Sequence, residues 1–142
     1  MTVKIPKILI VEDDRTNQYL IRELLEWKGY DVYTLSSGER FLEVVQSLKP
    51  DVILLDLKLP GSEHGGFTLL EQLNQTAISR PSVIIYSACS LPHDIATAKR
   101  LGAAHYLIKP VGIDEILRTI HMELLSWELE MTYGKMPVSH LV

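Results

Sequence analysis

Residues Asp51-Val52-Ile53-Leu54-Leu55-Asp56-Leu57-Lys58-Leu59-Pro60-Gly61 combine a short apolar run, one carboxylate and a Pro-Gly stop. Four consecutive apolar residues between polar ends are typical of a strand that is buried on both faces of a parallel sheet. Asp56 follows at the carboxyl end of this expected strand. A carboxylate beside a hydrophobic core is costly unless it is paired, hydrated or bound to a metal ion. Asp56 is therefore the first candidate for a functional residue.

The whole chain has the composition of one globular domain: 142 residues, 46% hydrophobic, with a formal net charge of -4. This charge gives no electrostatic reason to expect direct binding of nucleic acid. The single cysteine, Cys89, excludes an intrachain disulfide and a cysteine-based zinc site, and it fits a reducing compartment. The apolar run at residues 8–11 is too short for a signal peptide or a membrane span, so we expect a cytoplasmic protein that does not contact a membrane.

Short apolar runs alternate with helical patterns along the chain. Strands are expected at 8–11, 31–35, 52–55, 82–86 and 103–108, and helices begin near Thr16, Phe41, Phe67, Asp94 and Asp114. In the first helix, Tyr19, Leu20, Leu24 and Trp27 are spaced three or four residues apart, which indicates a helix that ends before Lys28-Gly29. Five strands alternating with five helices predict an α/β protein with an open, doubly wound parallel sheet.

Polar side chains follow four of these strands. Glu12, Asp13 and Asp14 follow the first, Asp56 the third, Ser87 the fourth and Lys109 the fifth. Because ligands of such sheets bind beyond the carboxyl ends of the strands, these groups are expected to meet. Oxygen ligands without histidine or thiolate suit Mg²⁺. The residues predict a phosphoryl site with Asp56 as nucleophile and with Lys109 and Ser87 contacting phosphoryl oxygens.

Several motifs, in this order and spacing, resemble the receiver domain of two-component response regulators, from about Lys7 to Leu125. The matching segments are residues 8–14, residues 51–61, Tyr86-Ser87-Ala88, Gly102-Ala103 and the run from Tyr106 to Pro110. The resemblance implies a flavodoxin-like receiver fold with strand order 2-1-3-4-5. We expect the receiver domain to span residues 1–125, followed by the end of the last helix and a tail at 126–142.

The resemblance also assigns roles to the site residues. Asp56 would accept a phosphoryl group from a sensor histidine kinase or a phosphotransfer protein. Asp13, Asp56 and the Lys58 carbonyl would bind Mg²⁺ directly, and Glu12 would bind it through water. Ser87 and Lys109 would stabilise the phosphoryl group.

The same resemblance implies a switch and a partner-binding face. Ser87 and Tyr106 would rearrange on phosphorylation and remodel the surface formed by the fourth helix, fifth strand and fifth helix. The Lys109-Pro110 peptide bond would be cis. We expect a phosphoacceptor signalling domain with no separate output domain in this chain, which binds a downstream protein partner and has at most slow self-dephosphorylation; a homodimer is left open.

Two alternatives are weighed against this phosphorylation-controlled switch. An aspartyl-phosphate phosphatase is disfavoured, because such enzymes usually have a second aspartate two residues after the nucleophile, where this chain has Lys58. A receiver-like scaffold that signals without phosphorylation stays open, because the loop at residues 61–66 is about two residues longer than the family pattern.

Overall fold

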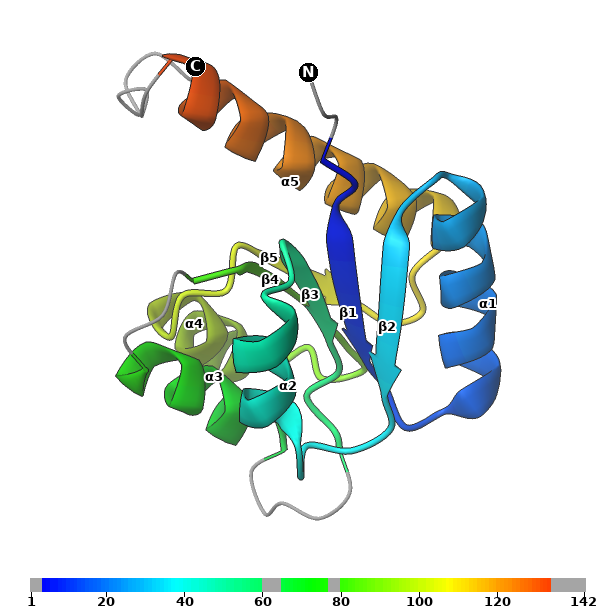
Figure 1. Cartoon of the computed structure of the whole chain (residues 1–142). Helices are drawn as coiled ribbons and strands as arrows, with labels where there is room; N and C mark the ends of the chain where they lie inside the picture. The colour runs from blue at the N-terminus through cyan, green and yellow to red at the C-terminus, as the bar shows by residue number, and fades with distance from the viewer. Residues whose placement is uncertain (1–3, 60–64, 77–79, 134–142) are drawn as a thin grey trace.

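The computed structural model describes residues 4–59, 65–76 and 80–133, with side chains of the last helix described as far as Ser126. Strands and helices alternate throughout (Figure 1). The elements are β1 (Lys7–Val11), α1 (Arg15–Trp27), β2 (Asp31–Leu35), α2 (Phe41–Leu48), β3 (Val52–Leu55), α3 (Gly66–Gln75), β4 (Ser82–Ser87), α4 (Pro92–Arg100), β5 (His105–Ile108) and α5 (Ile113–Tyr133).

The five strands form one sheet in the order β2-β1-β3-β4-β5, and each neighbouring pair is parallel. This confirms the predicted fold class and strand order. The register aligns the last residues of adjacent strands: Val11 pairs with Leu55, and Ser87 pairs with Ile108. Because all carboxyl ends lie at one edge, the residues that follow β1, β3 and β5 are brought together there.

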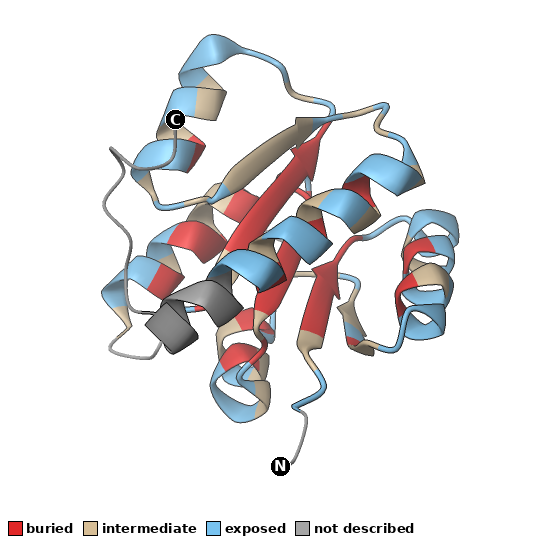
Figure 2. Cartoon of the chain, turned by 90° about the horizontal axis from the view of Figure 1, so that it is seen from above, coloured by how far each residue is buried: buried red, intermediate tan, exposed pale blue. Residues whose placement is uncertain are grey.

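The core has two layers, one on each face of the sheet. Alternate residues of a strand point to opposite faces. Leu9, Val11, Ile53 and Leu55 therefore pack with α2, α3 and α4. Their neighbours in the central strands, such as Ile8 and Leu54, pack with α1 and α5. Figure 2 shows the buried residues gathered in the central strands and on the helix faces toward the sheet.

The helix that the spacing of Tyr19, Leu20, Leu24 and Trp27 indicated is present as α1, but most of these side chains are not the ones that it buries. Trp27, Tyr19 and Leu20 are 81%, 64% and 44% exposed, whereas Ile21 and Leu25 are buried. Two residues correspond to about 200° around a helix axis, so Trp27 lies nearly opposite Leu25. Helix α1 therefore has apolar residues on both sides. Packing against the sheet buries the aliphatic side chains of Ile21 and Leu25.

Two helix ends differ slightly from expectation. Helix α4 begins at Pro92, earlier than predicted, because proline fits the first helical position, where the missing N–H is not needed. Helix α5 continues to Tyr133, so it extends well into the segment 126–142 that was expected to hold the end of the last helix and a tail.

Within the described residues, no helix combines the length and hydropathy that a bilayer crossing requires.

Candidate functional site: a carboxylate cluster with a lysine

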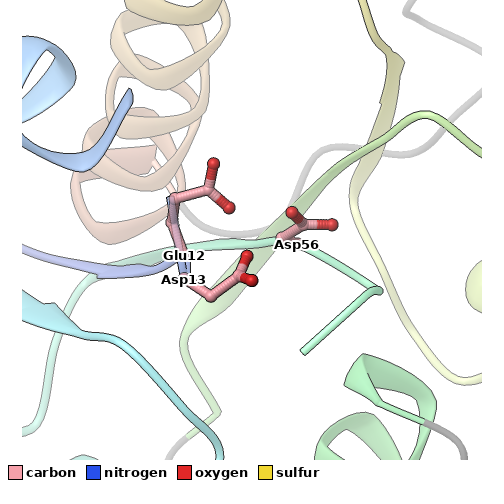
Figure 3. Close-up of side chains that lie close together, drawn as sticks. All are labelled: Glu12, Asp13 and Asp56. Atoms are coloured by element: carbon pink, nitrogen blue, oxygen red, sulfur yellow. The ribbon is translucent and has the colours of Figure 1, made fainter. Parts of the chain in front are cut away.

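Three carboxylates meet where β1 and β3 end (Figure 3). One oxygen from each of Glu12, Asp13 and Asp56 lies within 4.8 Å of the others. Glu12 is fully buried and Asp56 is 5% exposed, whereas Asp13 is exposed to solvent. The backbone N–H of Asp56 donates to the Val11 carbonyl (3.0 Å), so strand pairing itself holds the two acidic segments side by side.

The consecutive acidic residues after β1 have different surroundings. The Asp14 carboxylate caps α1 by accepting a hydrogen bond from the Asn17 backbone N–H (2.9 Å). The Asn17 side-chain amide in turn donates to Glu12 Oε1 (3.2 Å). The helix cap therefore fixes the group that orients Glu12, while Asp13 faces solvent.

Lys109 brings a cation to the cluster from the end of β5. Its Nζ is 3.0 Å from Asp56 Oδ2 and 3.4 Å from Glu12 Oε1. Burial acts to lower the pKa of Lys109, but the Asp56 and Glu12 carboxylates outweigh it and raise this pKa. The lysine is thus held as an ammonium ion. The peptide bond between Lys109 and Pro110 is cis.

Both oxygens of Asp56 have a donor. The Lys58 backbone N–H donates to Asp56 Oδ1 (3.0 Å), and Lys109 contacts Oδ2. The Lys58 carbonyl, which the resemblance assigns to a metal ion, stays a prediction; the amide of the same residue holds Asp56.

The surroundings of Glu12 disfavour its ionised form. Burial raises the pKa of Glu12 to about 7, the neighbouring Asp56 adds to this effect, and Lys109 opposes it. In addition, Glu12 Oε2 is one of the buried side-chain atoms, among the described residues, that lack a hydrogen-bond partner. An oxygen-only donor set with uncompensated negative charge fits a hard divalent cation such as Mg²⁺.

Ser87 and Tyr106 belong to a second group that is centred on Cys89, in the loop between β4 and α4. Ser87 is fully buried, and its Oγ accepts from the Cys89 backbone N–H (3.2 Å). The Tyr106 hydroxyl donates to the Cys89 carbonyl (2.8 Å). Cys89 Sγ donates to Asp94 Oδ2 (2.7 Å) in the first turn of α4. One loop residue therefore links β4, β5 and α4.

The structure thus brings together Glu12, Asp13, Asp56 and Lys109, and it places Ser87 and Tyr106 around the adjoining loop. Sequence reasoning missed the contacts of Asn17 and Asp94, because neither residue belongs to a motif that indicates this chemistry.

The loop after β3 returns to the site through two glycines. Gly65 has φ of 53°, and the Gly66 N–H donates to the Leu57 carbonyl (2.8 Å). A Cβ on Gly65 would overlap the Leu57 carbonyl oxygen, and one on Gly66 would come within 2.9 Å of the Asp56 carbonyl oxygen. Residues 60–64 of the loop, which was predicted to be longer than usual, lie outside the described residues.

A doubly wound five-stranded sheet, with carboxylates after β1 and β3 and a lysine after β5, defines a receiver-type α/β domain. The response regulator receiver domain family matches residues 8–121. The chain belongs to this family and is a receiver domain of the two-component type, a class of signalling domains.

Curated relatives agree with this assignment. The chain is 36% identical over 119 residues to protein PilH of Pseudomonas aeruginosa, covering 83% of this chain and 97% of PilH. It is 34% identical over 110 residues to sporulation initiation phosphotransferase F of Bacillus subtilis, covering 78% and 86%. Against the sensory transduction protein BceR of Halalkalibacterium halodurans, at 34% identity and 81% of this chain, the match spans 51% of that protein.

Solved receiver structures are also similar. A CheY-like receiver domain protein from Methanospirillum hungatei has a TM-score of 0.81 and 26% identity, covering 89% of this chain and 99% of that one. The BeF3-activated N-terminal receiver domain of RstA from Klebsiella pneumoniae has a TM-score of 0.75 and 29% identity, covering 83% and 97%.

Proposed function

We propose that this receiver accepts a phosphoryl group on Asp56 from a phosphohistidine of a sensor kinase or phosphotransfer protein. The observation that carries the proposal is the cluster itself: a nearly buried aspartate within 4.8 Å of two further carboxylates and 3.0 Å from a lysine ammonium. Phosphoryl transfer requires mainly alignment and charge neutralisation, which such a group of residues supplies.

In this reaction an Asp56 oxygen attacks phosphorus, so that an O–P bond forms while the donor's N–P bond breaks. The bonding electrons leave with the imidazole nitrogen, which takes up a proton. Lys109, already against Asp56, would neutralise one phosphoryl oxygen. The Ser87 hydroxyl, now an acceptor from the Cys89 amide, would turn to donate to another phosphoryl oxygen.

Asp13, Asp56 and the Lys58 carbonyl are proposed to hold Mg²⁺ directly, with Glu12 bound through water. When bound, the cation would neutralise the charge that gathers on the phosphoryl oxygens. The acidic residues suit this task because their own repulsion is left partly uncompensated by Lys109.

The proposed output is a change in the face formed by α4, β5 and α5. Ser87 and Tyr106 both contact Cys89, so movement of Ser87 toward the phosphoryl group would be transmitted to β5 and α4. A downstream protein partner would bind the changed face, and this would take place in the cytoplasm. The domain itself would catalyse no reaction beyond slow self-dephosphorylation. The name of the phosphotransferase F relative and the BeF3-activated state of the RstA domain are in keeping with such a cycle.

The test is intact mass after incubation with acetyl phosphate. We expect one phosphoryl adduct, acid-stable and base-labile, that forms with Mg²⁺ and is lost with EDTA. Asp56→Asn should abolish it. Asp51→Asn is the matched control, because Asp51 lies at the opposite end of β3 and contacts Lys4 and the Lys7 amide. An adduct that persists in Asp56→Asn, or that never forms in the parent, would argue for the scaffold alternative or another acceptor.

A further inference from the structure

Tyr86, the residue before Ser87 in β4, has an unusual position for an aromatic side chain. It is 2% exposed and belongs to the core layer under α1 and α5. Yet it reaches the edge of the sheet, where the Lys109 Nζ lies 4.4 Å from the centre of its ring. A cation at this distance over a ring face is attracted by the negative face of the π system.

The ring therefore constrains the ammonium from a second direction. A lysine side chain has four flexible bonds, and a single carboxylate contact leaves its position loosely defined. Here the Lys109 Nζ is held between the Tyr86 ring and Asp56 Oδ2, which is 3.0 Å away. The lysine is also largely screened, since its side chain is 24% exposed, and this strengthens both contacts.

The hydroxyl of Tyr86 and the carboxylate of Glu12 share one feature. The Tyr86 hydroxyl and Glu12 Oε2 are the two side-chain atoms, in the part of the chain that the structure describes, that are buried without a hydrogen-bond partner. The Lys109 Nζ that lies over the Tyr86 ring is also 3.4 Å from Glu12 Oε1, so the Tyr86 phenol and the Glu12 carboxylate lie beside the same ammonium. Burial, followed by the charge of Glu12, raises the pKa of Tyr86. One is a donor and the other an acceptor, and leaving both unpaired is costly.

The Tyr86 side chain borders open space on one side. A hollow of about 460 Å³ adjoins the ring and is lined by Asn17, Lys109 and Val111, among others. The hollow lies between α1 and the start of α5, and Tyr86 and Lys109 both line it.

We propose that Tyr86 is a positioning residue of the phosphoryl site: its ring fixes the Lys109 ammonium, and its hydroxyl donates to Glu12 and orients it for the metal ion. This inference rests on the proposed function. The ring and the hydroxyl of Tyr86 have separate roles, so removing the hydroxyl alone and removing the whole phenol are expected to give different results.

Tyr86→Phe keeps the ring and removes the hydroxyl, whereas Tyr86→Leu removes both. Two affinities are measured: Mg²⁺ by NMR titration without any phosphodonor, and beryllofluoride, a phosphoryl mimic, at saturating Mg²⁺. For Tyr86→Phe we expect Mg²⁺ affinity to fall about threefold, with beryllofluoride affinity almost unchanged. For Tyr86→Leu we expect beryllofluoride affinity to fall about tenfold as well, because the ring contact to Lys109 is lost.

Ile84→Ala is the control, because Ile84 lies on the same strand and in the same core layer, away from Lys109 and Glu12. It should lower the unfolding temperature without changing either affinity. If Tyr86→Leu does not fold, Tyr86→Met replaces it, since methionine is unbranched and adapts to an irregular space without a ring.

A Tyr86→Leu or Tyr86→Met protein with parental beryllofluoride affinity would refute the role of the ring. A Tyr86→Phe protein with parental Mg²⁺ affinity would refute the role of the hydroxyl, and equal losses in Ile84→Ala would show that both effects are merely structural. Failure of the proposed function would be seen separately, as the absence of an Asp56-dependent mass adduct. The Mg²⁺ titration needs no phosphodonor, so it would still test the role of the hydroxyl.

Discussion

Glu12 is the residue whose chemistry is most altered by the fold. It is fully buried, it accepts from Asn17 and Lys109, and it still lies beside the Asp56 carboxylate. Since its pKa rises from 4.5 to about 7, the folded protein binds a proton there that the unfolded chain releases. The ionised form of Glu12 is therefore unfavourable in the folded protein unless a further cation is present.

This predicts a pH-dependent stability in metal-free buffer. Between pH 4.5 and about 7 the folded state binds more protons than the unfolded state, so the free energy of unfolding contributed by Glu12 decreases as pH rises. Glu12→Gln has no carboxyl group to ionise at this position, so its free energy of unfolding should not show this decrease with pH. In urea unfolding series, we expect the variant to gain stability relative to the parent as pH is raised through this range.

Glu71→Gln, on the exposed face of α3, controls for the loss of one negative charge. A difference between Glu12→Gln and the parent that stays constant across the pH range would contradict the assignment of the raised pKa to Glu12.

At the scale of elements, the connection between β3 and α3 packs closely against the backbone next to Asp56. Gly65 and Gly66 pack against the backbone of residues 56 and 57, and the Gly65 φ of 53° is in the left-handed region. The chain therefore needs glycine there for two reasons, conformation and space.

Substitution should separate these two reasons. Gly29 also has positive φ, of 97°, but a Cβ there would meet nothing within 4 Å. We expect Gly29→Ala to lower the free energy of unfolding by about 1 kcal/mol, from backbone strain alone. Gly65→Ala should cost about 1–3 kcal/mol more, from the added overlap with Leu57, and should slow phosphorylation because the backbone next to Asp56 shifts. Equal losses in urea unfolding of the two variants would show that the close packing is unimportant.

The loop between β4 and α4 is the second element that controls the site. Its Cys89 carbonyl receives the Tyr106 hydroxyl, which ties the loop to β5. This is a contact between a predicted switch residue and the loop that follows Ser87.

Tyr106→Phe should release that tether. We expect a loss of about 0.5–1.5 kcal/mol in the free energy of unfolding and faster amide hydrogen exchange in the segment from Ala88 to Leu91, measured by mass spectrometry. Tyr33→Phe is the control, because its hydroxyl bonds to Asp31 on the far edge strand. Unchanged exchange in the β4–α4 loop of Tyr106→Phe would mean that the loop is held by other contacts.

For the whole molecule, short apolar runs that alternate with helical patterns predicted the doubly wound parallel sheet, and the resemblance to receiver domains supplied the strand order. Strands such as 8–11 and 52–55 are buried on both faces, so their sequences are uniformly apolar and easy to recognise. Parallel pairing then places Glu12, Asp56 and Lys109 at one edge, which is why these three could be predicted before their distances were known.

Features that depend on packing could not be predicted in this way. Helix α1 carries apolar residues on opposite sides, and only the contact with the sheet selects Ile21 and Leu25. The contact of the Tyr86 ring with Lys109 depends on how far a core side chain reaches, and no residue spacing encodes that. The domain boundary at residue 125 stays a prediction, since the family match ends at 121 while α5 continues to Tyr133.

The most direct measurement is to locate the phosphoryl group at the level of the residue. After treatment with acetyl phosphate and Mg²⁺, reduction with borohydride converts an acyl phosphate of aspartate to homoserine, which peptide mass spectrometry can place. We predict homoserine at position 56, and nowhere else in the peptides that cover Glu12, Asp13 and Asp51. Reduction at one of those residues instead, or an unmodified Asp56 in a sample that carries the intact-mass adduct, would contradict the account.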